Sequence, residues 1–305
     1  MIQAVLFLIL TTLTAFTTAQ PVDKLTIMSF NLWLAASQVN NGFEKTLNAI
    51  KVAQADVVAL QESMEIGSRI ARALGWHAYA PKDSSLAIIS RYPITQTYAF
   101  SYNQAGLGAR IKLTPDRDFV LWSVHLSSSP YAPYQACLDA RDSKDIIRGQ
   151  HDAQLKEFNG LLDKAHKTLE GSADKPVFFV GDFNTPSHLD WVPEAIIRNC
   201  GYTIEYPVTV AAQKAGLKDA YRVYWPDPLL SPGVTWSPIY KNYKYPTGKT
   251  EPMDRIDFVY FSGDAVRVTR ATTFLLGKPR SAPNHWDNIW PSDHSAVLVD
   301  VVLPR

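Results

Sequence analysis

The segment 177–186 joins an apolar run to two side chains that carry oxygen ligands. Four β-favouring residues lead into Gly181-Asp182-Phe183-Asn184 and stop at a proline, which predicts a buried strand ending near residue 182. Side chains alternate between faces along an extended segment, so Asp182 and Asn184 point to the same side. A carboxylate beside a carboxamide suits a divalent cation or a nucleophile held by hydrogen bonds. By itself, the stretch fits an Asx turn closing a core strand equally well.

Other apolar runs also end at polar or ionisable residues. They predict further strands at 24–33, 56–62, 86–90, 109–113, 119–126, 256–261 and 296–301. The polar residues at or near strand ends are Asn31, Glu62, His125, Asp182, Asn184, Asp257, Asp293 and His294. Turn formers often end core strands, but this many predict one site that gathers them. Such oxygen-rich groups favour Mg²⁺, Mn²⁺ or Ca²⁺ over zinc, and clustered carboxylates repel one another without a cation.

Helical spacing of apolar residues predicts helices between the strands. They cover 43–53, 66–74, 142–169 and 191–199, and an irregular aromatic and proline-rich region follows at 202–252. Strands recur throughout with helices interspersed, which predicts an α+β fold with a large sheet content. No linker-like stretch or short-period repeat interrupts residues 20–305, so we expect a single domain there.

Length and charge set broad limits on function. The chain has 305 residues, 46% of them hydrophobic and 19% charged, with a formal net charge of +1. This is a globular composition without the basic excess that dominates general nucleic-acid binding. A strongly electrostatic DNA binder is therefore not the expected class, although a local basic groove is compatible with the total.

The N-terminal residues form an uncharged apolar stretch. Residues 1–19 centre on the run at 4–10 and end in small residues before Gln20. The pattern predicts a secretory signal peptide over 1–19, cleaved near Ala19, and hence a secreted, extracellular protein. The usual early Lys or Arg is absent, which leaves an uncleaved anchor as the alternative. No later segment is long and apolar enough to cross a membrane.

Cys137 and Cys200 are the two cysteines of the chain. In a secreted protein they permit one disulfide, and two buried thiols are the alternative. Two thiols are too few for a zinc–cysteine site.

Seven short motifs follow one another along the chain. They are Ser-Phe-Asn-Leu-Trp (29–33), Leu-Gln-Glu (60–62), Ser-Arg-Tyr-Pro (90–93), Ser-Val-His-Leu (123–126), Gly-Asp-Phe-Asn (181–184), Asp-Arg-Ile-Asp-Phe (254–258) and Ser-Asp-His-Ser (292–295). Each is weak alone, but in this order they resemble the endonuclease/exonuclease/phosphatase superfamily, which includes DNase I-like nucleases, neutral sphingomyelinases and inositol polyphosphate 5-phosphatases. The resemblance implies a four-layer α/β sandwich: two mostly antiparallel sheets face to face, helices outside and an active site at one edge.

The resemblance also implies roles for the metal ligands and the catalytic groups. Glu62 would be the principal metal ligand, helped by Asn31 and Asp293. The remaining catalytic candidates would orient the attacking water and a phosphate oxygen (Asp182, Asn184), flank the phosphate (His125, His294), or orient a histidine or serve a second metal (Asp257). Whether Asp182 or a histidine accepts the proton of the water stays open.

Further residues are assigned to substrate contacts or to packing. The resemblance further implies that Arg110 contacts the phosphate. His188 is predicted to line the substrate pocket or to make local hydrogen bonds at a helix start. Asp254 is expected to be a surface partner of Arg255. Aromatic residues crowd the loops, at Tyr131, Tyr134, Trp225, Trp236, Tyr240, Tyr243 and Tyr245. They predict stacking on bases or sugars or contact with a lipid interface, with plain loop packing as the alternative.

These observations predict a secreted, monomeric, divalent-metal-dependent hydrolase of phosphate esters. The expected cofactor is Mg²⁺, with Mn²⁺ or Ca²⁺ as alternatives, and an in-line water would attack a phosphodiester in nucleic acid or a phospholipid headgroup. The alternatives are a phosphomonoesterase of the inositol-phosphatase type and a secreted binding protein that kept the fold without the chemistry. Glu62, Asp182 and His294 are all present, which favours an enzyme.

Overall fold

Two six-stranded sheets form the centre of the protein. The computed structural model describes residues 24–99, 104–171, 175–243 and 248–303, and the expected signal peptide at 1–19 lies outside them. Sheet A has the strand order β11 (Arg267–Phe274), β12 (Ala296–Val302), β1 (Leu25–Asn31), β2 (Val57–Gln61), β4 (Ala87–Ser90) and β3 (His77–Tyr79). Sheet B has the order β5 (Ile94–Tyr98), β6 (Gly106–Thr114), β7 (Arg117–His125), β8 (Val177–Asp182), β10 (Asp257–Ser262) and β9 (Lys218–Asp219).

Each sheet is mostly antiparallel with one parallel pair. β1 runs parallel to β2 in sheet A, and β7 runs parallel to β8 in sheet B. Because these parallel strands end at the same edge, residues that follow them are brought together there. The prediction of two mostly antiparallel sheets is confirmed.

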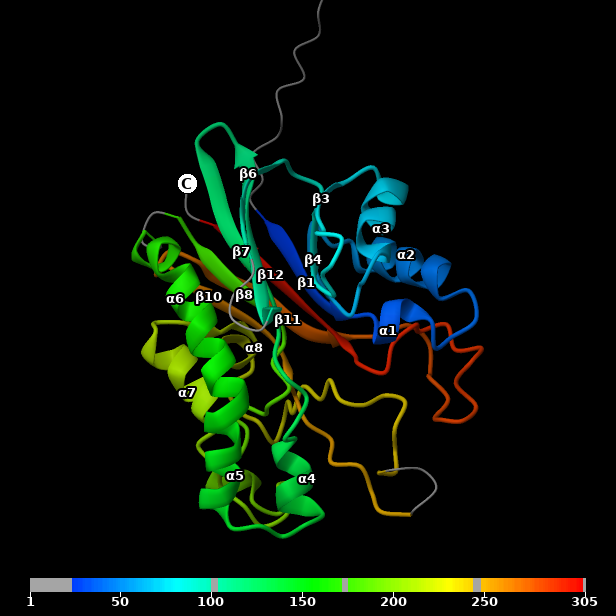
Figure 1. Cartoon of the computed structure of the whole chain (residues 1–305), viewed down its shortest axis with the longest axis vertical. Coiled ribbons are helices and arrows are strands. Elements are labelled where there is room, and N and C mark those ends of the chain that lie inside the picture. The colour runs from blue at the N-terminus through cyan, green and yellow to red at the C-terminus, as the bar shows by residue number, and fades with distance from the viewer. Residues whose placement is uncertain (1–23, 100–103, 172–174, 244–247, 304–305) are drawn as a thin grey trace, which may run out of the picture.

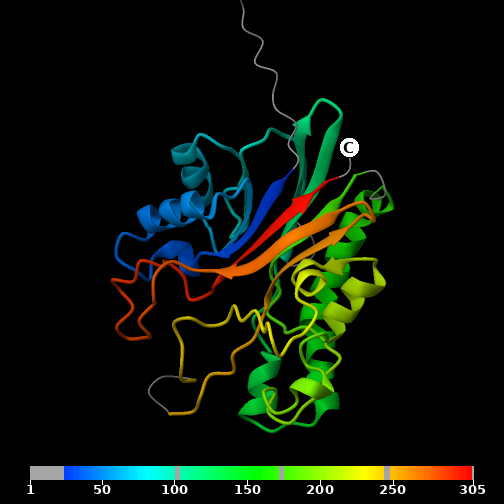
Figure 2. The same ribbon diagram turned by 180° about the vertical axis from the view of Figure 1, so that it is seen from behind.

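Helices cover the outer faces of both sheets (Figures 1 and 2). α2 (Gly42–Ala53) and α3 (Ile66–Leu74) pack on sheet A, while α6 (Lys156–Glu170) and α7 (Pro207–Lys214) pack on sheet B. The remaining short or irregular helices are α1 (Trp33–Ala36), α4 (Ala132–Cys137), α5 (Ser143–Gln150), the π-helix His151–Leu155, the 3-10 helix Pro193–Ala195 and α8 (Ala220–Tyr224). The four-layer sandwich is confirmed. None of the helices within the described ranges has the length and apolar character needed to cross a membrane.

The central strands are buried on both faces, which explains their unbroken apolar runs. In β1, Leu25 and Ile27 belong to the core between the sheets, whereas Met28 and Phe30 pack under α2 and α3. β8 divides in the same way between the inter-sheet core and the core beneath α6. Alternation along an extended strand thus serves two hydrophobic cores at once.

The expected helix at 191–199 is wrong for most of its length. Only the 3-10 helix Pro193–Ala195 forms, because Val192 before it is extended and the Trp191 indole N–H donates to Asp254 Oδ1 at 2.9 Å. The edge strands β3, β5 and β11 were not predicted. β3 and β5 are mostly exposed, β11 is partly buried, and the polar residues of all three interrupt the apolar pattern that marks a strand.

Cys137 and Cys200 form a disulfide across 63 residues of sequence. The bond joins the end of α4 to the turn that follows the 3-10 helix. Of the two alternatives, the disulfide is therefore correct and two buried thiols are not.

Gly181 is required where β8 passes β7. A Cβ atom at this position would lie 1.9 Å from the backbone oxygen of Val124, its neighbour in β7. The Gly of the Gly-Asp-Phe-Asn motif therefore permits the parallel strand pairing that carries His125 and Asp182.

We predict that Gly181→Ala destabilises the protein by about 3 kcal/mol or more, because the strands must separate to admit the methyl group. Urea unfolding would measure the change as a lower midpoint at constant slope. Gly171→Ala is the matched control, since its Cβ would meet nothing nearer than 3.9 Å. Equal stability of the two variants would contradict the steric argument.

Candidate active site

The predicted strand-end residues converge at one edge of the two sheets. In sheet B, Asp182 pairs directly with Asp257 of β10 and with His125 of β7. In sheet A, Asn31 pairs with Gln61, so Glu62 follows at the same edge. Of these residues, Glu62, His125 and Asp182 line a cavity of about 960 Å³.

Asp182 lies at the centre of this site and is 1% exposed. Its Oδ2 accepts a hydrogen bond from Asn31 Nδ2 at 3.0 Å, and its Oδ1 accepts one from the backbone N–H of Asn184 at 2.8 Å. The Nε2 atoms of His125 and His294 lie 3.6 and 3.7 Å from Oδ2. One carboxylate thus joins groups from both sheets.

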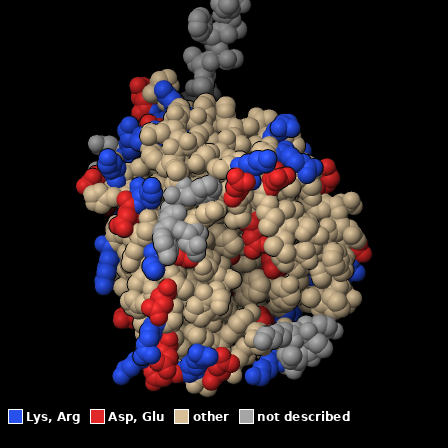
Figure 3. Space-filling view, viewed as in Figure 1, with Lys and Arg blue, Asp and Glu red and all other residues tan. Residues whose placement is uncertain are grey.

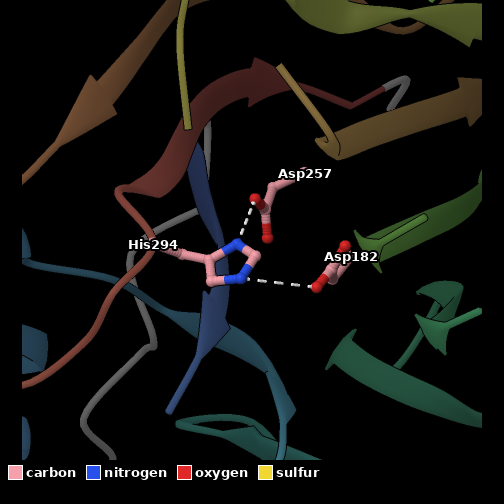
Figure 4. A group of neighbouring side chains, drawn as sticks. All are labelled: Asp182, Asp257 and His294. Carbon is pink, nitrogen blue, oxygen red and sulfur yellow. Dashed lines mark hydrogen bonds and ion pairs between the residues drawn. The ribbon is translucent and has the colours of Figure 1, made fainter. Parts of the chain in front are cut away.

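His294 is held by a second carboxylate (Figure 4). Its Nδ1 lies 2.9 Å from Asp257 Oδ2, which assigns the Nδ1 proton to that contact and turns Nε2 toward Asp182. Burial lowers the pKa of His294, but the carboxylates of Asp257 and Asp182 outweigh it and raise the pKa to about 10. The ring is therefore an imidazolium at neutral pH.

The Ser-Asp-His segment is fixed by contacts that the motif did not indicate. Ser292 Oγ donates to the backbone oxygen of Asn31 at 2.6 Å and accepts from the His294 backbone N–H at 3.0 Å. The Trp290 indole donates to the His294 carbonyl at 2.6 Å, and the Trp236 ring centroid lies 5.0 Å from that of His294. These contacts fix the His294 backbone and place an indole against its ring.

A left-handed turn positions Glu62. The four residues of α1, Trp33–Ala36, have φ between 46° and 59°, and Glu62 itself has φ 51°. This conformation is costly for residues other than glycine and is found mainly at functional sites. It lets the Leu34 backbone N–H donate to Glu62 Oε2 at 2.6 Å, with Asn31 Nδ2 3.4 Å from Oε1.

The cavity is rich in acids. Burial together with Asp257 raises the pKa of Asp182 to about 6, and burial together with Glu62 raises that of Asp293 to about 7. None of the described residues that line the cavity is Lys or Arg. Figure 3 shows acidic side chains in the hollow at the middle of this face, with most Lys and Arg toward its periphery. A bound cation would reduce the repulsion among these carboxylates.

The donor set fits a hard divalent ion. The Oδ1 atom of Asp257 is buried without a hydrogen-bond partner, and both cysteines are committed to the disulfide, so the available ligands are mainly oxygens. Ligand atoms of Asp182, Asp257 and His294 all lie within 4.8 Å of one another.

Two sets of residues in the site offer metal ligands. An ion held between Asp257 and His294 would have to replace their 2.9 Å hydrogen bond. In the other set, Glu62 raises the pKa of Asp293, so a cation between these two carboxylates would relieve their repulsion. Together with Asn31, these residues are the better candidates for the principal metal position.

Arg110 does not lie at this cavity, and its predicted phosphate contact is corrected. On β6, Arg110 pairs with Val120, five residues before the strand end at His125. Its guanidinium donates to Asp118 Oδ1 at 3.1 Å and to the Tyr98 hydroxyl at 3.2 Å. The side chain is thus engaged away from the catalytic edge.

His188 also lies outside the cavity, so its predicted role in the substrate pocket is corrected too. Its backbone N–H and Nδ1 lie 3.0 and 2.7 Å from Thr209 Oγ1, and its Nε2 lies 2.6 Å from Gln213 Oε1. Both partners belong to α7, which agrees with the alternative of local hydrogen bonding.

Asp254 and Arg255 are buried rather than paired at the surface. Arg255 makes ion pairs with Asp190 at 2.9 Å and Asp219 at 2.7 Å, while Asp254 accepts from Trp191. The expected pairing of the two neighbours is therefore wrong, because adjacent residues point to different partners in an extended segment.

We predict that Asp257→Asn lowers the pKa of His294 by roughly 1 to 3 pH units, since a neighbouring negative charge is lost. The raised pKa gives stability that is complete below the ordinary value near 6.5 and is lost as pH rises through about 10. In the variant this stability should be lost at lower pH. An NMR titration of the His294 ring measures the pKa, and Asp145→Asn, an exposed acid paired with Arg148, serves as control. An unchanged titration of His294 would contradict the assignment.

Comparison with known proteins agrees with this geometry. A family model described as the Endonuclease/Exonuclease/phosphatase family matches residues 28–294. An uncharacterized Caenorhabditis elegans protein, F14F9.5, is 31% identical over 318 residues, covering 98% of this chain and 99% of the relative.

Solved structures share the fold at low sequence identity. Truncated Caenorhabditis elegans TDP2 aligns with a TM-score of 0.60 at 18% identity, covering 92% of this chain and 97% of that one. D. rerio TDP2, complexed with a single-strand DNA product, aligns with a TM-score of 0.56 at 17% identity, covering 91% and 98%. The family model matches most of the chain, and the Caenorhabditis elegans relative aligns with nearly all of it. The chain therefore belongs to the Endonuclease/Exonuclease/phosphatase family.

Proposed function

We propose that the protein is a divalent-metal-dependent phosphodiesterase. Members of its family are phosphoric ester hydrolases that depend on a divalent metal. The observation that carries the proposal for this chain is the buried Asp182, which is held by Asn31 and lies within 3.7 Å of two histidines beside Glu62. That arrangement has a group for each need of phosphate-ester hydrolysis.

The side chains divide the chemical work. Asp182, with a pKa raised to about 6, is suited to orient the attacking water and to accept its proton near neutral pH. The Nε2–H of His294 is 3.7 Å from Asp182, too far for a direct hydrogen bond, and is available to a phosphate oxygen. A divalent ion held by Glu62, Asn31 and Asp293 would neutralise charge on the non-bridging oxygens when bound.

The charge of the cavity favours a diester over a monoester. Glu62, Glu157, Asp182 and Asp293 line it, and no Lys or Arg does so among the described residues. A phosphodiester carries one negative charge, whereas monoesters of inositol polyphosphates bring several that basic side chains would have to offset. A silent binding protein would not need the His294–Asp257 pair or an acid with a pKa near that of a general base.

Nucleic acid and a phospholipid headgroup are the two candidate sources of the diester. D. rerio TDP2 is complexed with a single-strand DNA product, which makes nucleic acid a candidate by analogy of fold. The acidic and aromatic cavity instead favours a headgroup without further phosphates.

We also propose that the protein is exported. The uncharged apolar stretch at 1–19 and the disulfide support this, because disulfides persist in oxidising compartments. N-terminal sequencing of protein recovered from the medium of expressing cells should begin close to Gln20. Retention of the full chain in the cells would contradict export.

We predict that the purified protein hydrolyses bis(p-nitrophenyl) phosphate with Mg²⁺ and loses this activity in chelator. Asp182→Asn should lower kcat by about 10² to 10⁴, the usual contribution of a general base, while thermal unfolding stays cooperative. Glu62→Gln should raise the Mg²⁺ concentration needed for half-maximal rate. Glu170→Gln, an exposed acid on α6, is the control. Full activity of Asp182→Asn, or hydrolysis insensitive to chelator, would contradict the proposal.

A further inference from the structure

One side of the cavity is aromatic. Tyr131, Tyr134 and Trp236 line it, and we refer to them as the aromatic wall. The rings of Tyr131 and Tyr134 meet edge to face with centroids 4.7 Å apart, and Trp236 lies 5.0 Å from His294. The wall therefore begins directly beside the ring expected to contact the phosphate.

A buried carboxylate lies behind the aromatic wall. Oε1 of Glu251 accepts a hydrogen bond from the Tyr134 hydroxyl at 2.5 Å and another from Trp236 Nε1 at 2.8 Å. Glu251 is 3% exposed, so it is not itself a surface group of the cavity. Hydrogen bonds donated to an acid place negative charge at the polar edges of both rings and strengthen the electrostatic attraction of their faces for a cation.

The wall is held rigidly by contacts from outside the catalytic strands. Tyr134 belongs to α4, whose last residue, Cys137, is joined by the disulfide to Cys200. Trp236 forms bridges with Asp254 and with His294. A pre-formed wall loses little conformational freedom when a ligand binds, which is a property of binding subsites.

The charge around the wall is unsuited to a polyanionic strand. A nucleic acid brings further phosphates on either side of the scissile one, and proteins meet these mainly with Lys and Arg. The described lining of the cavity offers four carboxylates, two histidines, several serines and the aromatic wall, and neither Lys nor Arg. The carboxylates attract a cationic substituent and repel additional phosphates.

We propose that the aromatic wall, with Glu251 behind it, binds a substituted ammonium group of the substrate. The substrate is then a zwitterionic phosphodiester, such as a choline or ethanolamine ester, and this inference rests on the proposed phosphodiesterase function. Ammonium groups bind over the faces of Trp and Tyr by cation–π attraction, and several aromatic faces beside an acid form a cage for choline-type cations. The position beside His294 puts this group next to the scissile phosphate.

The test compares two substrates of the same shape. p-Nitrophenyl phosphorylcholine carries a quaternary nitrogen, and p-nitrophenyl 3,3-dimethylbutyl phosphate has carbon in its place. The wild-type protein with Mg²⁺ should favour the choline ester by about tenfold in kcat/KM, the scale of a desolvated cation–π contact. Because Trp236 contacts His294, a variant there also changes the basal rate, so the measured quantity is the ratio between the two substrates.

Variants of the wall should remove this preference. Trp236→Leu and Tyr134→Leu should bring the ratio close to one, and Glu251→Gln, which keeps an acceptor but not the charge, should lower it partway. Tyr224→Leu is the matched control, because Tyr224 is a half-exposed aromatic residue outside the cavity lining. Its ratio and its basal rate should equal those of the wild type. A preference that survives Trp236→Leu and Tyr134→Leu would overturn the assignment.

A binding measurement separates failure of the subsite from failure of the chemistry. Tetramethylammonium should quench tryptophan fluorescence in the wild type and bind much more weakly to Tyr134→Leu. Turnover of both esters at equal rates, without tetramethylammonium binding, would overturn the subsite and leave the phosphodiesterase proposal standing. Binding without turnover of any diester would support the subsite and overturn the proposed chemistry.

Two further substrates decide the source of the ammonium group. Sphingomyelin vesicles beside soluble glycerophosphocholine distinguish a lipid headgroup from a free ester. Single-stranded DNA cleaved with a higher kcat/KM than either of them would overturn the inference in favour of a nucleic-acid substrate.

Discussion

The site depends on one buried carboxylate, which extends from one sheet and is bound by a residue of the other. Asp182 extends from sheet B and accepts a hydrogen bond from Asn31 of sheet A, with His294 at 3.7 Å from the same oxygen. An isolated carboxylate at 1% exposure would be strongly unfavourable, so these partners are a condition of its burial. They can meet it only if the sheets pack face to face with their catalytic edges aligned. The inter-sheet core and the catalytic geometry therefore require the same arrangement.

The local charge balance follows from this burial. His294 supplies one positive charge to Asp182, Asp257 and Asp293, and no Lys or Arg is among the described residues lining the cavity. Negative charge is therefore in excess there. Burial, together with the charge of Glu62, raises the pKa of Asp293 to about 7. A divalent ion, or the ammonium group of a zwitterionic substrate, would reduce this excess of negative charge. The same electrostatic imbalance thus underlies both the metal requirement and the proposed choice of substrate.

Much of the fold and of the site follows from local sequence, because the strands that carry the chemistry are buried on both faces. Their long apolar runs predict β1, β2, β7, β8, β10 and β12, and the residues at or near their ends predict the catalytic group. Arg110 and His188 have suitable chemistry but lie outside the cavity. Strand register places Arg110 and contacts with α7 hold His188, and a local sequence pattern predicts neither the register nor these contacts. The left-handed turn Trp33–Ala36 is likewise unpredictable, because four residues other than glycine adopt positive φ only under tertiary constraint.

The aromatic wall shows why substrate choice is harder to predict than reaction type. The reacting groups are fixed by sheet register, whereas Tyr134 and Trp236 come from segments 102 residues apart that meet at Glu251. Segments outside the strands can change without disturbing them, which allows one scaffold to serve many substrates. In this protein, substrate recognition is not fully separate from the reacting groups, because Trp236 contacts both Glu251 and the His294 ring. A substitution of Trp236 that alters what the wall binds is therefore expected to disturb the His294 ring as well, so recognition and chemistry are coupled through this one indole.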